Sequence, residues 1–144
     1  MNPKSLVHPA QLSHDTRPRI LAVEDDEDNL FLITCVLEQL GYPYKATTSG
    51  QQALSIVKTC SLELILLDVV LPDFDGTAIL KQLRRNKRTA DIPIIAVTGL
   101  ALPEDRPRLL KLGFNDYISK PYLLEDLEAL ITSYLTQKIF QSLA

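Results

Sequence analysis

The chain has 144 residues, of which 46% are hydrophobic and 23% charged, and its formal net charge is −3. This length favours one domain with a substantial core over two, and the composition is that of an ordinary globular domain. The slightly acidic balance does not indicate a nucleic-acid-binding chain, which is more often basic. No apolar run approaches the roughly 20 residues of a membrane span. We therefore expect no membrane insertion.

Residues 1–18 lack the apolar segment of a secretory signal and predict a poorly ordered tail ahead of a folded region at 19–144. Cys35 and Cys60 fit no disulfide or metal-ligand pattern, and each is predicted to be a small buried apolar residue. Reduced cysteines are typical of cytosolic proteins, so a cytoplasmic location is expected.

The apolar run at 19–23 predicts a strand, and a cluster of five acidic residues follows it at once. Residues 28–40 then predict a helix, because apolar side chains recur on one face and Gly41 stands where a C-terminal cap belongs. A weaker strand at 44–48 leads to a second predicted helix over 50–59, with a serine before it as the cap.

Residues 62–68 form a continuous apolar run that ends on Asp68. A parallel strand that is covered on both faces requires this pattern. Turn residues follow, then a helix predicted over 77–85, a polar connector, and a second buried strand at 92–98.

The segment 103–113 predicts a shorter helix, which starts near Arg106 because Pro107 is tolerated only in a first turn. Residues 116–119 predict a fifth strand. An amphipathic helix over 123–140 closes the chain. Its apolar stripe is wide, and two explanations stay open for the part past residue 136: an apolar area for a partner, or a frayed end.

Strand and helix alternate five times, which predicts an α/β fold: a doubly wound, five-stranded parallel sheet with five helices. In such sheets, ligands bind beyond the carboxyl ends of the strands. Four predicted strands end on, or lead directly to, groups capable of chemistry: Glu24 with Asp25, Asp68, Thr98 and Lys120.

Carboxylates gathered this closely repel one another and shift towards protonation unless a cation joins them. Ligand sets made only of oxygen atoms suit Mg²⁺. We therefore expect Glu24, Asp25 and Asp68 to form a magnesium site. The alternative, that an acidic residue only caps the following helix, is preferred for Asp26 and Asp28.

Four blocks, "ILAVEDDEDN", "LLDVVLPDFDG", "IIAVTG" and "YISKP", resemble in order and spacing the signature motifs of response regulator receiver domains. The resemblance covers about residues 19–136. It implies the flavodoxin-like fold, in which the strand order is 2-1-3-4-5.

The resemblance implies that Asp68 accepts a phosphoryl group and forms an aspartyl-phosphate. Asp25, Asp68 and the backbone carbonyl of Val70 would then bind Mg²⁺ directly, and Glu24 would bind it through a water molecule. In this family, the cation offsets the charge of the incoming phosphoryl oxygens.

By the same resemblance, Lys120 pairs with the phosphoryl group, and its peptide bond to Pro121 is expected to be cis. Thr98 matches the switch hydroxyl that hydrogen-bonds a phosphoryl oxygen. Tyr117 matches the aromatic residue that turns inward when Thr98 moves. Together these groups would couple a local charge change to a surface.

The function implied is phosphorelay signalling: a sensor histidine kinase or a histidine phosphotransfer protein supplies the phosphoryl group. Too few residues follow the last helix for an output domain, so we expect signalling through contact with a downstream protein, without direct DNA binding. A homodimer is left open. No enzyme activity is expected beyond self-phosphorylation from small donors and slow self-dephosphorylation.

Two positions depart from the family pattern. Val70 and Leu100 are apolar where the family has polar groups that help to position the hydrolytic water, which predicts slow self-dephosphorylation. Pro107 displaces a helix on a face that the family uses for partners. Two other functions remain: a receiver-like scaffold that is never phosphorylated, and a small-molecule phosphatase, which normally has a second aspartate where Val70 stands.

Overall fold

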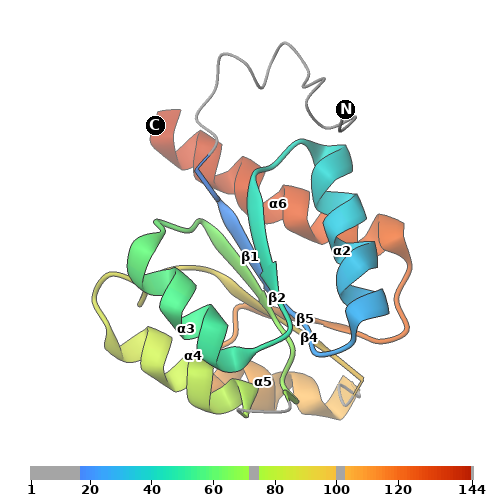
Figure 1. Cartoon of the computed structure of the whole chain (residues 1–144), viewed down its shortest axis with the longest axis vertical. Coiled ribbons are helices and arrows are strands. Elements are labelled where there is room, and N and C mark those ends of the chain that lie inside the picture. Colours follow the sequence, from blue (N-terminus) through green and yellow to red (C-terminus); the bar gives the residue numbers. More distant parts are fainter. Residues whose placement is uncertain (1–16, 72–74, 100–102, 144) are drawn as a thin grey trace.

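A computed structural model describes residues 17–71, 75–99 and 103–143, with the backbone alone for Pro103 and residues 136–143. A five-stranded sheet runs through its centre, with helices on both faces (Figure 1). The strands are β1 Ile20–Val23, β2 Tyr44–Thr47, β3 Leu64–Leu67, β4 Ile94–Thr98 and β5 Asp116–Ser119. The helices are α2 Glu27–Leu40, α3 Gly50–Thr59, α4 Gly76–Arg85, α5 Arg106–Leu112, preceded by a 3₁₀ turn at Pro103–Asp105, and α6 Leu124–Leu143. The predicted tail, 1–18, lies outside the described residues except for its last two.

The sheet has the order β2-β1-β3-β4-β5, and every neighbouring pair is parallel. This order and the five helices confirm the predicted flavodoxin-like, doubly wound fold. β3 lies in the middle of the sheet and all of its residues are buried, as its continuous apolar run predicted.

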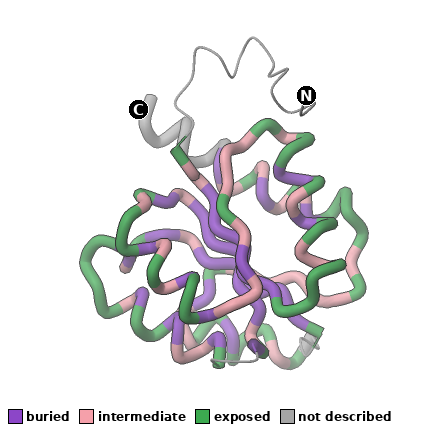
Figure 2. Tube along the Cα trace, viewed as in Figure 1, coloured by how far each residue is buried: buried purple, intermediate pink, exposed green. Residues whose placement is uncertain are grey.

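Side chains that alternate along the strands feed two separate core layers. Leu21 and Val23 of β1 pack with the helices α3, α4 and α5, whereas Ile20 and Ala22 pack with α2 and α6. The buried strands in Figure 2 therefore lie between two helical layers whose outer surfaces are exposed. A sheet covered on both faces is rigid, and this fixes the positions of the residues at the ends of its strands.

Helix caps agree with the sequence. Asp26 caps α2, because its carboxylate accepts a hydrogen bond of 3.0 Å from the Asn29 N–H, and Gly41 ends that helix with φ 83°. Ser49 caps α3 in the same way. Pro107 lies in the first turn of α5, as predicted from its missing N–H.

The prediction that both cysteines are buried is wrong. Cys35 is exposed and Cys60 is only partly buried. Ile33, Val36 and Leu37 are the buried residues of α2, so the helical phase turns Cys35 towards solvent. A cysteine is often buried, but its position on the helix decides the outcome.

The wide apolar stripe predicted for the closing helix packs into the core. Leu127, Ile131 and Leu135 are buried, while Leu130 and Tyr134 are partly buried and pack against the same cluster. The side chains past Leu135 are not among those that the structure describes. In the part of the chain that the structure covers, no helix is long and apolar enough to cross a membrane.

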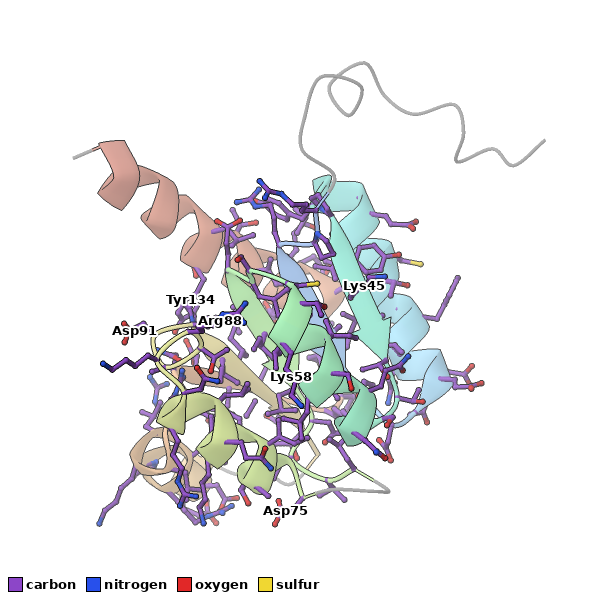
Figure 3. All side chains as sticks on the ribbon, turned by 60° about the vertical axis from the view of Figure 1, so that its left-hand side comes forward. Lys45, Lys58, Asp75, Arg88, Asp91 and Tyr134 are labelled. Carbon is purple, nitrogen blue, oxygen red and sulfur yellow. The ribbon has the colours of Figure 1, made fainter. Side chains whose placement is uncertain are left out.

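Arg84, at the end of α4, joins three segments at the edge of the sheet where β4 and β5 begin. Its guanidinium donates to the carbonyl of Gly113 at 3.0 and 2.8 Å, and to the carbonyls of Ala90 and Ile92 at 3.0 and 2.7 Å. It also donates to Asn115 Oδ1 at 2.7 Å. Nearby, Arg88 donates to the carbonyl of Lys58 at 3.1 Å, which links the connector to α3 (Figure 3).

We expect Arg84→Met to lower the free energy of unfolding by about 3 kcal/mol, because three half-buried carbonyls lose their donor. The matched change Arg85→Met, at the exposed neighbour, should alter it by less than about 0.5 kcal/mol. Urea unfolding monitored by circular dichroism measures both values. Equal losses for the two variants would contradict the role assigned to Arg84.

Candidate functional site

The predicted carboxylates and Thr98 lie at the carboxyl-terminal ends of the parallel strands, which form one edge of the sheet. Glu24 and Asp25 follow β1, Asp68 follows β3, and Thr98 is the last residue of β4. The Asp68 N–H donates to the Val23 carbonyl at 2.9 Å, which aligns the ends of β1 and β3. The sheet itself therefore brings these residues together.

Lys120 completes the group at the end of β5, an outer strand of the sheet. It follows β5, and its N–H donates to the Thr98 carbonyl at 3.0 Å. Its peptide bond to Pro121 is cis, as the resemblance implied. The ammonium lies 2.6 Å from Glu24 Oε1 and 3.1 Å from Asp68 Oδ2, so one cation pairs with two carboxylates.

Three carboxylates share this small space. Ligand oxygens of Glu24, Asp25 and Asp68 all lie within 4.8 Å of one another. Glu24 is fully buried and Asp68 is 3% exposed, whereas Asp25 is exposed and leaves the cluster open to solvent. One ammonium cannot balance three carboxylates, and every ligand atom is an oxygen. The residues therefore fit a small, hard divalent cation such as Mg²⁺.

Burial raises the pKa of Glu24 to about 7, and the side chains of Asp68 and Asp25 add to this against the effect of Lys120. The pKa of Asp25 is lowered, chiefly by its hydrogen bond with the Glu24 side chain. Burial opposes charge on Lys120, but Glu24 and Asp68 together raise the pKa of its ammonium group. Burial and the neighbouring carboxylates thus oppose full ionisation of Glu24, and a bound cation would offset this effect.

The backbone around the cluster is also fixed. Glu24 Oε2 accepts the Asp26 N–H at 3.1 Å, and Asp68 Oδ1 accepts the Val70 N–H at the same distance. The side chain of Val70 is 53% exposed beside the site. Whether the Val70 carbonyl binds a cation stays a prediction. Leu100, the other apolar position noted in the sequence, lies outside the described residues.

Gly76, which the sequence predicts only as a turn residue, lies against the backbone of Asp68 and Val69. A Cβ atom at Gly76 would lie 2.3 Å from the Asp68 carbonyl oxygen and 2.8 Å from Val69 Cα. Its N–H donates to the Val69 carbonyl at 2.7 Å, and Asp75 caps α4 just before it (Figure 3). Only glycine allows α4 to begin this close to the end of β3.

Thr98 and Tyr117 lie on neighbouring strands. Thr98 is 2% exposed and pairs with Ser119, while Tyr117 pairs with Ala96. The Tyr117 ring is half-buried and packs against the core layer under α3, α4 and α5. The two residues predicted to act as a switch are therefore close along the β4–β5 pair, and their coupled movement stays a prediction.

A model of the response regulator receiver domain family matches residues 20–132. The chain belongs to this family. As a receiver domain, it is 36% identical over 116 residues to the polar-differentiation response regulator DivK of Brucella ovis, covering 81% of this chain and 94% of DivK. It is 34% identical over 118 residues to the DNA-binding dual master transcriptional regulator RpaA of Synechocystis, covering 82% of this chain and 49% of RpaA. The receiver domain thus spans about half the length of RpaA and nearly all of DivK.

Solved receiver structures share the fold. The receiver domain of the sensor histidine kinase PA1611 from Pseudomonas aeruginosa superposes with a TM-score of 0.75 at 32% identity, covering 83% of this chain and 98% of that domain. That structure has a magnesium ion coordinated in its active-site cleft. The likeness agrees with the cation preference that the oxygen ligands of this chain indicate.

We expect Mg²⁺ affinity to rise about tenfold from about pH 6 to about pH 8. With a pKa of about 7, Glu24 keeps its proton at the lower pH, and an entering cation must displace it. Isothermal titration calorimetry in buffers of different ionisation enthalpy measures both the affinity and the released proton. Glu24→Gln should flatten this dependence, whereas the exposed control Glu125→Gln should not. A wild-type affinity that does not change with pH would contradict the shift.

Proposed function

We propose that this receiver domain accepts a phosphoryl group on Asp68 from a phosphohistidine of a sensor histidine kinase or a histidine phosphotransfer protein. The observation that supports this most directly is the joint placement of Asp68, Asp25 and Lys120 at one edge of the sheet. Asp68 is held by a rigid strand, is charge-paired, and has an open side towards Asp25. A carboxylate so placed is a usable nucleophile.

In the proposed transfer, an Asp68 carboxylate oxygen attacks the phosphorus atom and forms the new P–O bond. The P–N bond to the donor imidazole breaks, and the imidazole leaves with the electron pair. The Lys120 ammonium lies 3.1 Å from Asp68 Oδ2, and this contact supports a role in holding the added negative charge. Bound Mg²⁺ would supply charge neutralisation for the phosphoryl oxygens.

The proposed cation ligands are Asp25, Asp68 and the Val70 carbonyl, with Glu24 acting through water. Glu24 Oε1 lies 2.6 Å from the Lys120 ammonium, and Glu24 is fully buried. This contact supports a role for Glu24 in orienting Lys120 as well. Thr98 and Tyr117 would then carry the change to the surface.

The proposed output is a changed protein-binding surface, with no enzymatic step beyond self-phosphorylation and slow self-dephosphorylation. Downstream of it we propose a protein partner, with no direct DNA contact by this domain and a cytoplasmic location. The acidic net charge supports contact with proteins over nucleic acid.

We expect a small phosphodonor with Mg²⁺, or beryllofluoride, to modify the wild type at Asp68 and to leave Asp68→Asn unmodified. Asp91→Asn is the matched control, because Asp91 precedes β4 and so lies at the opposite edge of the sheet (Figure 3). Intact mass and peptide mapping measure the adduct. No adduct in the wild type would favour the unphosphorylated scaffold, and turnover of a phosphate ester would favour a phosphatase.

We expect the aspartyl-phosphate to persist well beyond seconds, because the exposed Val70 side chain offers no polar atom to the hydrolytic water. Val70→Asn should shorten the lifetime by about five- to tenfold, which corresponds to one added hydrogen bond. Val70→Ala, which stays apolar, should leave it unchanged within about twofold. Decay of the phosphorylated species with Mg²⁺ present measures these values, and a wild-type lifetime of seconds would contradict the prediction.

A further inference from the structure

The first turn of α5 carries an arginine where a helix ordinarily favours an acidic residue. Arg106 is the first residue of the helix, and Pro107 follows it. A cation at this end is opposed by the helix dipole. Asp105, which precedes the helix, makes no side-chain cap hydrogen bond and pairs with Arg108 at 3.7 Å instead. One contact of Arg106 offsets this effect.

That contact is the ring of Tyr117. The Arg106 guanidinium carbon lies 5.9 Å from the centroid of this ring, within the range of a cation–π interaction. Arg106 also lies near Tyr134 of α6, whose pKa is raised by burial and by Asp116, while the positive charge of Arg106 opposes that rise. The guanidinium of Arg106 therefore lies near tyrosines of two other elements, Tyr117 of β5 and Tyr134 of α6.

The Tyr117 ring is therefore held from two sides. Its inner side packs against the core layer of α3, α4 and α5, and Arg106 lies on the ring from α5. Tyr117 and Thr98 occupy the same pair of strands, β5 and β4. Any movement of the ring has to break or rebuild its contact with Arg106, because the two groups belong to different elements.

We propose that Arg106 is a positioning residue: it holds the Tyr117 ring in the arrangement seen here and opposes the movement that phosphorylation of Asp68 brings to Thr98 and Tyr117. The second half of this inference rests on the proposed function. A contact made in the arrangement seen here stabilises that arrangement, so a ligand that favours another one must overcome it. Loss of the contact therefore shifts the population away from the arrangement seen here.

The first test is on the metal-free protein and needs no phosphorylation. Proton and carbon resonances of the Tyr117 ring, assigned with Tyr117→Phe, should move in Arg106→Gln and stay near the wild-type values in Arg106→Lys, which keeps the cation. Arg108→Gln, on the same helix, is the matched control and should leave them in place. Unchanged Tyr117 resonances in a folded Arg106→Gln would overturn the proposal.

The second test is binding of beryllofluoride with Mg²⁺, followed by tyrosine fluorescence, since the chain has five tyrosines and no tryptophan. Arg106→Gln should bind about two- to fivefold more tightly than the wild type, the factor expected for loss of an exposed cation–π contact. Arg106→Lys and Arg108→Gln should bind like the wild type. In a Tyr117→Leu background, Arg106→Gln should have no further effect.

The remaining outcomes are also decisive. Weaker or unchanged binding by Arg106→Gln would overturn the opposing role, and so would an effect that persists undiminished in the Tyr117→Leu background. Failure of the wild type to form any adduct at Asp68 would overturn the proposed function and the opposing role with it. The proposal that Arg106 positions the Tyr117 ring would still be tested by the ring resonances of the metal-free protein.

Discussion

The ion pairs of Lys120 are the interaction on which the site depends. A fully buried Glu24 and a nearly buried Asp68 at one sheet edge would be very unfavourable without a cation between them. The Lys120 ammonium lies within 3.1 Å of both carboxylates. The third carboxylate, Asp25, is exposed to solvent. The cluster therefore has more carboxylates than its one ammonium ion can balance. This excess of carboxylates favours binding of a divalent cation, and the proposed phosphoryl transfer depends on that cation.

The rest of the fold serves to bring these charges together and keep them there. β3 is buried on both faces, so its last residues cannot shift without disturbing two core layers. Gly76 lets α4 start directly against the backbone of Asp68, and Arg84 fastens the opposite end of α4 to the segments that precede β4 and β5. The site therefore combines rigid strand ends with one side that is open to a ligand, as binding sites on parallel sheets generally do.

Much of this could be predicted from the sequence. Continuous apolar runs predicted buried parallel strands, and Gly41, Ser49 and Pro107 predicted helix boundaries correctly, because caps and proline act through local backbone chemistry. Strand limits were less accurate: β3 starts at Leu64, two residues later than predicted, because pairing with β1 sets its extent. The burial of Cys35 was predicted wrongly, since it depends on which face of α2 meets the sheet.

The sequence by itself determined the order of the elements, the sheet edge that carries the chemistry and the residue types placed there. These follow from periodicity and from the fact that parallel strands end at the same edge. Only the tertiary structure decided that Glu24 is fully buried against Lys120, that Gly76 must have no side chain, and that Arg106 lies on the Tyr117 ring. The first contact joins segments far apart in the chain, and the other two join neighbouring helices and strands. All three depend on how helices pack on the sheet, which local sequence patterns do not encode.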